Sequence, residues 1–193
     1  MKKRLKSIIL CHIFLPFQAL AQMHTDDMNY WIEKYQSVSY PLKSIHISSS
    51  YGKRADPFTG KGRFHQGIDL EAKYEVVFAM FDAEIKRVGY DPMSGNFITL
   101  KAGNYTISYC HLSEIWVKED ELVYAGQELG RSGSTGRATG PHLHISCRLH
   151  GKIENPYHLL TFVRDTQLKA VDALGLNKDV KLSPEDFLRT YAP

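Results

Sequence analysis

Four histidines and one aspartate are the residues of this chain whose types and spacing could do chemistry together. They are His65 and Asp69, four positions apart, then His111, and the pair His142 and His144. Imidazole and carboxylate groups are ordinary ligands of a catalytic zinc ion, which takes three protein ligands and leaves one position for water. Five candidates for three places leave two histidines to act on a substrate, so the set predicts a zinc hydrolase. The sequence has no His-Glu-x-x-His segment, which excludes the thermolysin arrangement.

The segment that carries His142 and His144 is predicted to be a β-strand. Residues two apart lie on one face of a strand, so both imidazoles can meet around one metal-bound water. Alone, the pair would also fit two exposed strand histidines. Here it follows a glycine-rich loop over residues 130–141, whose backbone must turn tightly or approach something closely, and this favours a functional site.

The spacing of His65 and Asp69 fits either one face of a helix or a loop that enters a strand. Gly67 and the alternation of Ile68 and Leu70 favour the strand. On that strand Gly67 and Asp69 would share one side, with Ile68 and Leu70 packed behind them.

Short apolar runs separated by turn signals predict an antiparallel β domain over residues 45–160. The runs are 76–79, 83–88, 97–100, 105–109 and 142–149, and the turns are Asp91-Pro92, Ser94-Gly95-Asn96 and Gly103-Asn104. Several runs alternate, as expected for strands with one buried face.

These segments, in this order, resemble the M23 family of zinc metallopeptidases, the LytM and lysostaphin type of peptidoglycan endopeptidase. The matching segments are Ser50-Tyr51-Gly52-Lys53-Arg54, Asp56-Pro57-Phe58-Thr59-Gly60, His65-x-Gly67-x-Asp69, His111-Leu112-Ser113, Gly126-Gln127, Gly133-x-Thr135-Gly136-x-x-Thr139-Gly140-Pro141-His142-Leu143-His144 and Asn155-Pro156. The resemblance implies a mainly β fold, β-sandwich-like, with a groove over an antiparallel sheet and short flanking helices.

The resemblance also implies the division of work among the five residues. His65, Asp69 and His144 would bind one Zn²⁺, and His111 and His142 would act on the reacting peptide bond. One of these two histidines would take or orient the proton of the water, and the other would donate to the developing oxyanion. Which histidine has which role stays open at this point.

The implied function is an exported zinc endopeptidase that hydrolyses peptide cross-links or stem peptides of peptidoglycan. One alternative is a non-enzymatic LytM-type activator of a cell-wall amidase, although such regulators typically lose site residues and this chain retains all five. Another is a zinc peptidase that acts on a protein. The motifs do not distinguish among D-Ala–diaminopimelate, D-Ala–Gly and Gly–Gly bonds, and they identify no protein partner.

The first 21 residues resemble a secretory signal peptide. Lys2, Lys3, Arg4 and Lys6 precede an apolar run, and Ala19-Leu20-Ala21 fits a cleavage site. We expect export to the periplasm or cell envelope, or to the extracellular space, with no stable membrane insertion after cleavage; an uncut membrane anchor is the alternative. Removing the four basic residues leaves 20 Lys and Arg against 21 Asp and Glu, so no basic surface argues for nucleic acid.

Cys110 and Cys147 remain in the mature chain, beside the candidate site. Strand alternation predicts that Cys110 points away from the face of His111, and Cys147 away from that of His142 and His144. On neighbouring strands the two sulfurs would then share the opposite face. Buried free thiols are the favoured interpretation, a disulfide is the alternative, and zinc ligation by either cysteine is not expected.

Two flanking segments complete the predicted organisation. Residues 22–44 form a lead with one or two helical turns near 30–35, and residues 161–193 form a helical extension packed on the domain. Within it, apolar spacing predicts a helix over 160–174 that ends at Gly175, and a second start at Ser183. Asn29 or His24 could inhibit the site by binding its metal, but we expect the lead to pack as a helix instead.

Overall fold

The computed structural model of this protein describes residues 25–176. The predicted signal peptide, His24 and the predicted helix start at Ser183 lie outside the described residues. Over the described part, short strands and turns follow one another where the sequence predicts them, and the mainly β, antiparallel fold class is confirmed.

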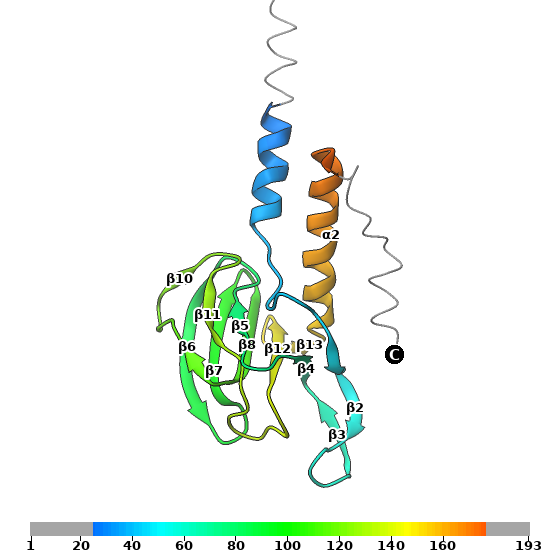
Figure 1. Cartoon of the computed structure of the whole chain (residues 1–193), viewed down its shortest axis with the longest axis vertical. Helices are drawn as coiled ribbons and strands as arrows, with labels where there is room; N and C mark the ends of the chain where they lie inside the picture. The colour runs from blue at the N-terminus through cyan, green and yellow to red at the C-terminus, as the bar shows by residue number, and fades with distance from the viewer. Residues whose placement is uncertain (1–24, 177–193) are drawn as a thin grey trace, which may run out of the picture.

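One large antiparallel sheet forms the centre of the molecule (Figure 1). Its strands lie in the order β1-β4-β12-β8-β7-β6-β10, and β13 pairs with β12 off this path. The bounds are β1 Ile47–Ser49, β4 Gly67–Glu71, β6 Ala83–Asp91, β7 Gly95–Ala102, β8 Tyr105–Leu112, β10 Leu122–Val123, β12 His142–Leu149 and β13 Lys152–Glu154. The order places β4, β12 and β8 next to one another, although they are far apart in the sequence.

Two smaller sheets flank the large one. The first has the order β5-β11-β9, with bounds β5 Val76–Phe78, β11 Glu128–Arg131 and β9 Glu114–Ile115. The second is the hairpin of β2 Gly52–Ala55 and β3 Gly62–His65, which projects from the body of the molecule (Figure 1). The hairpin matters for function because His65 is its last residue.

Strand alternation separates the core from the site, as the sequence predicts. On β4, Ile68 and Leu70 are buried, and on β12 they face Ile145 and Leu143 in register. These apolar side chains hold the strands against the core, each worth roughly 1.5–3 kcal/mol when fully buried. The other face of β4 and β12 is thereby left for the polar residues Asp69, His142 and His144.

The expectation for the two cysteines is confirmed in part and wrong in part. Both thiols are free and buried. However, Cys110 lies directly opposite His144 in the β8–β12 pairing, so it shares the site face, whereas Cys147 belongs to the core. The reason is a β-bulge in β8. Tyr109 and Leu112 pair with Ile98 and Asn96 of β7, so two residues of β8, Cys110 and His111, lie opposite one residue of β7. His111 has a φ of 63°, and this local turn places it on the same face as Cys110.

Two helices flank the sheets and extend from the same end of the molecule (Figure 1). Helix α2, Tyr157–Ala173, contributes Leu159, Leu160 and Val163 to the core. It ends at Leu174, and Gly175 follows with a φ of 67°, which confirms the predicted helix and its stop. No helix within residues 25–176 combines the length and the apolar character needed to cross a membrane.

The helix over residues 25–36 is longer than the predicted one or two turns. Its side chains are exposed apart from Trp31, which is partly buried, so the expectation that this helix packs on the domain is wrong. The lead contacts the core through Val38, Leu42 and Ile45 instead. Asn29 is exposed on the helix and does not line the cleft described below, so its placement does not support self-inhibition.

Candidate metal centre

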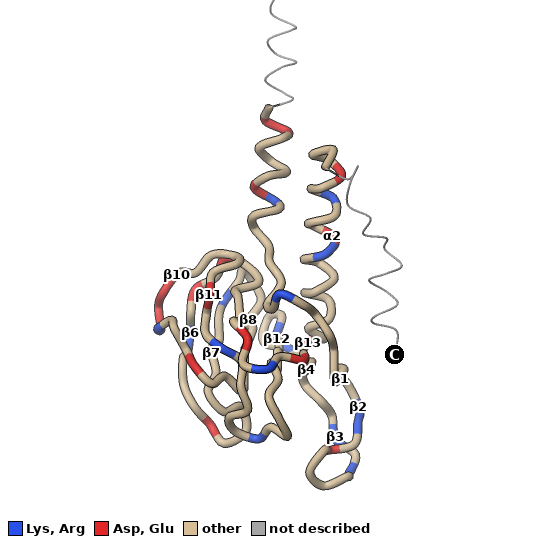
Figure 2. The backbone as a smooth tube through the Cα atoms, in the orientation of Figure 1, with Lys and Arg blue, Asp and Glu red and all other residues tan. Residues whose placement is uncertain are grey.

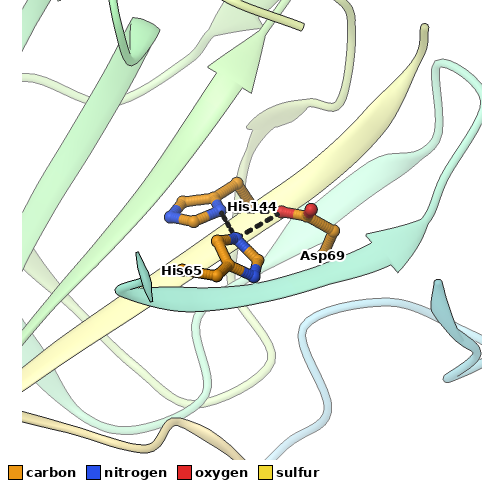
Figure 3. Close-up of side chains that lie close together, drawn as sticks. All are labelled: His65, Asp69 and His144. Carbon is orange, nitrogen blue, oxygen red and sulfur yellow. Dashed lines mark hydrogen bonds and ion pairs between the residues drawn. The ribbon is translucent and has the colours of Figure 1, made fainter. Parts of the chain in front are cut away.

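Three of the predicted site residues converge on one point. His65 ends β3, Asp69 is the middle residue of β4, and His144 lies opposite Asp69 in the β4–β12 pairing. Figure 3 shows their side chains pointing toward one another. The strand interpretation of residues 67–71 is therefore confirmed, and the helical alternative for His65 and Asp69 is wrong.

The donor atoms have the spacing of a single-metal site. One ligand atom from each of the three residues lies within 4.8 Å of the other two. His65 Nε2 is 3.1 Å from His144 Nδ1 and 3.2 Å from Asp69 Oδ1, and His144 Nδ1 is 2.7 Å from Asp69 Oδ1. Donors bound at 2.0–2.1 Å on a tetrahedral ion lie about 3.3 Å apart. Two nitrogens and one carboxylate oxygen at these separations fit a zinc ion and leave a fourth position.

Neighbouring groups fix the orientation of these ligands. His65 Nδ1 donates to Ser50 O at 2.8 Å, which leaves the Nε2 lone pair free for a metal. Arg54 donates to the second carboxylate oxygen of Asp69 at 3.3 Å. Burial alone would raise the pKa of Asp69, but its close contacts with the His144 and His65 rings hold that pKa well below its usual range. The carboxylate is therefore ionised, as a metal ligand must be.

Gly67 gives His144 the room it needs. A Cβ at Gly67 would lie 2.6 Å from the His144 ring and 2.3 Å from Ile145 O. The imidazole therefore lies over the backbone of β4, and only glycine permits this approach. This explains the glycine between His65 and Asp69.

His111 and His142 lie beside this centre with their rings toward each other. Their ring centroids are 4.7 Å apart, and that of His111 is 5.8 Å from that of His144. His142 Nε2 lies 3.6 Å from Asp69 Oδ1. The five predicted residues thus come together as one constellation, and no residue of the predicted set lies elsewhere.

A backbone carbonyl fixes the tautomer of each of these two histidines. His111 Nδ1 donates to Thr135 O at 2.8 Å, and His142 Nδ1 donates to Gly140 O at 2.9 Å. A carbonyl can only accept, so each neutral ring keeps its lone pair on Nε2. Burial lowers the pKa of His111 to about 4, so this ring is neutral and able to accept a proton at neutral pH.

The centre lies in an open cleft of about 940 Å³. The hairpin β2–β3 contributes Arg54, Arg63 and Phe64 to its lining, and residues 137–141 contribute the facing segment. Lys and Arg positions and Asp and Glu positions are interspersed along the described backbone (Figure 2). The cleft has room for an extended peptide.

Several residues that support the site carried no role in the sequence reasoning. They are Ser50, Arg54, Asp56, Thr135, Arg137 and Gly140. Each belongs to a segment that the family resemblance quotes, but their functions depend on contacts between distant segments. Alternation and spacing carry no signal for such contacts.

An antiparallel sheet that brings two histidines and one carboxylate within reach of one metal ion, with two further histidines beside them, is a candidate metal centre. The model of peptidase family M23 matches residues 63–156. The catalytic domain of the prophage-encoded M23 protein EnpA from Enterococcus faecalis is similar in structure, with a TM-score of 0.53 and 31% identity over 60% of this chain and 91% of that chain. The chain belongs to peptidase family M23.

Two further similarities concern longer proteins. A zinc-containing peptidase from Vibrio cholerae has a TM-score of 0.57 and 32% identity over 62% of this chain and 39% of its own. The peptidoglycan DD-endopeptidase ShyC of Vibrio cholerae is 35% identical over 119 residues, which are 60% of this chain and 28% of that protein. The chain thus matches only between about a quarter and two fifths of the length of these longer proteins.

Proposed function

We propose that this protein is a zinc-dependent endopeptidase that hydrolyses peptide bonds of bacterial peptidoglycan in the cell envelope. The observation that carries the proposal is the convergence of three metal-donor atoms and the Nε2 atoms of two further histidines in one open cleft. The name of ShyC, a peptidoglycan DD-endopeptidase, supports peptidoglycan as the substrate and favours cross-links that follow D-alanine.

His65, Asp69 and His144 are the proposed zinc ligands. Zinc held there would supply a Lewis acid able to lower the pKa of water from about 15.7 toward about 7. Ser50 and Arg54 keep His65 and Asp69 oriented toward that position.

His111 is the proposed general base. Its Nδ1 proton is engaged by Thr135 O, so its Nε2 can accept the proton of the attacking water. His111 is 7% exposed, and this burial disfavours a charged resting state.

His142 is the proposed donor to the oxygen of the scissile carbonyl. Its Nδ1 is engaged by Gly140 O, so the proton that it donates is one carried on Nε2, which lies 3.6 Å from Asp69 Oδ1. Loss of one such donor typically lowers the rate by about 10²–10³.

The amidase-activator alternative has no support in the structure, because all five residues are present and converge.

Digestion of purified peptidoglycan sacculi tests the proposal. The mature protein should release uncross-linked muropeptides, a zinc chelator should stop the release, and added zinc should restore it. Mass spectrometry of the products identifies the bond. His144→Ala should lose both zinc and cleavage, and His111→Ala should keep zinc and lose cleavage.

His158→Ala is the matched control, because His158 is exposed on α2 and does not line the cleft. It should cleave like the unsubstituted protein. Sacculi that stay intact with zinc stoichiometrically bound would contradict the proposal.

A further inference from the structure

Asp56 joins two segments that are distant in the sequence, the β2–β3 hairpin and the loop that contains Arg137. The carboxylate accepts two hydrogen bonds from Arg137, Oδ2 from Nη1 at 3.0 Å and Oδ1 from Nη2 at 2.9 Å. It accepts a third from Arg63 at 3.1 Å, and the backbone N–H groups of Phe58 and Thr59 donate to it at 3.0 and 3.1 Å. Asp56 is 5% exposed, so this cluster is a buried link between the β2–β3 hairpin and the glycine-rich loop.

The same glycine-rich loop supplies the carbonyls that orient both reactive histidines. Thr135 O accepts from His111, and Gly140 O accepts from His142. Arg137 lies between these two positions, in a segment bounded by Gly136 and Gly140. The start of this segment is held by the turn between β6 and β7, because a Cβ at Gly136 would lie 2.2 Å from Gly95 N and the N–H of Arg137 donates to Met93 O at 3.1 Å. The side chain of Arg137 is a further contact, and it reaches the hairpin.

The two ends of this segment are anchored differently. Thr135 Oγ1 donates to Leu112 O at 2.8 Å and accepts from the N–H of Asn96 at 2.9 Å, so the His111 end has its own attachment to the sheet. Between residues 136–141 and the hairpin, by contrast, the described part of the chain shows no hydrogen bond or ion pair other than those of Arg137 with Asp56. A Cβ at Gly140 would meet no atom within 4 Å, and Gly140 lies between two backbone anchors, Arg137 N–H to Met93 O at 3.1 Å and His142 N–H to Gly133 O at 3.0 Å.

We propose that Arg137, held by Asp56, is a positioning residue for His142: it fixes the loop whose Gly140 carbonyl orients the ring, while Thr135 independently positions His111. The inference deepens the proposed peptidase function and depends on it for its catalytic consequence. The orientation of the ring itself is a structural claim that can be tested without any substrate.

The chemistry of the link suits this task. A planar guanidinium that binds both carboxylate oxygens fixes direction as well as distance, which a lysine cannot do. Arg137 also lies over the Phe58 ring, 4.3 Å from its centroid, which restricts the arginine further. The Arg137 guanidinium holds the pKa of Asp56 well below its usual range, so the link persists at every pH at which the protein would act.

The test compares three variants by nuclear magnetic resonance of the histidine side chains in the zinc-loaded protein. Arg137→Gln should broaden or shift the Nδ1–H signal of His142 and leave that of His111 in place. Thr135→Val, which removes the hydroxyl anchor, should broaden or shift the Nδ1–H signal of His111 and leave that of His142 in place. Arg131→Gln is the control, because Arg131 forms an exposed ion pair with Glu114 at 3.1 Å and, within the described residues, no hydrogen bond or ion pair with either histidine.

Hydrolysis and zinc content are measured on the same proteins. Arg137→Gln should lower kcat about 10- to 100-fold with one zinc retained, because a displacement near 1 Å can cost about 10²-fold in rate. Arg137→Lys, which keeps the charge and loses the fork, should fall between Arg137→Gln and the unsubstituted protein. If Arg137→Gln does not fold, Asp56→Asn is judged by the same criteria.

Two results would overturn the inference. One is a His142 signal in Arg137→Gln that matches the Arg131→Gln control. The other is an equal disturbance of His111 and His142, which would indicate a general structural role. Because the signals need no substrate, the inference can fail or hold even if sacculi are never cleaved.

Discussion

Gly67→Ala introduces one methyl group beneath a proposed zinc ligand. The new Cβ would lie 2.3 Å from Ile145 O and 2.6 Å from the His144 ring. Carbon contacts are comfortable at about 3.5–4.0 Å, so β12 or the ring must move by about 1 Å. The ring alone cannot relieve the contact, because the shortest distance is to the backbone of β12.

The size of the effect follows from this displacement. Overpacking of this kind typically destabilises a protein by about 1–3 kcal/mol. Disturbing the groups that orient a metal ligand typically weakens metal affinity about 10- to 100-fold. We therefore expect Gly67→Ala to lose about 1.4–2.7 kcal/mol of zinc-binding free energy.

Competition against a coloured zinc chelator measures the affinity, and thermal unfolding with and without zinc measures the stability. Gly62→Ala is the matched control, because it lies in β3 and an added Cβ meets no atom within 4 Å. A zinc affinity of Gly67→Ala equal to that of Gly62→Ala would refute the reasoning, since the ligand geometry would then not depend on this close approach.

Three further outcomes are expected. In metal-free protein, NMR should show the His111 ring titrating near pH 4, and a midpoint near 6.5 would contradict the burial argument. Because the folded pKa lies below the unfolded value of about 6.5, the contribution of His111 to stability is complete above pH 6.5 and is lost as pH falls toward 4. After unfolding without reductant, Cys110 and Cys147 should both react with a thiol reagent, because they lie on opposite faces of the sheet; an intramolecular disulfide between them would contradict this placement. Zinc at about 100 times its Kd should stabilise the protein by about 2.7 kcal/mol, and a chelator should reverse the rise in Tm; an unchanged Tm would argue against a site in the folded state.

Local patterns in the sequence predicted a large part of the fold. Alternation at Ile68 and Leu70 predicted a strand with Asp69 on the opposite face, and the structure confirms it. Spacing predicted the helix before Gly175. These predictions hold because side-chain alternation and helical periodicity depend only on neighbouring residues.

The cysteines show where local patterns failed. Strict alternation placed Cys110 on the face opposite His111, but a single extra residue in β8 brings both to the site face. A bulge depends on how β8 pairs with β7, and pairing is a property of two distant segments.

The sequence by itself determined the chemistry available to this protein: which imidazoles and which carboxylate exist, and which face of its own strand each occupies on β4 and β12. The tertiary structure alone decided that β3, β4, β8 and β12 bring those groups to one point, that Gly67 admits the His144 ring, and that Arg137 and Asp56 join the loop to the hairpin. The physical reason is that strand order and close approach arise from burial of the whole core, to which residues far apart in the chain contribute together.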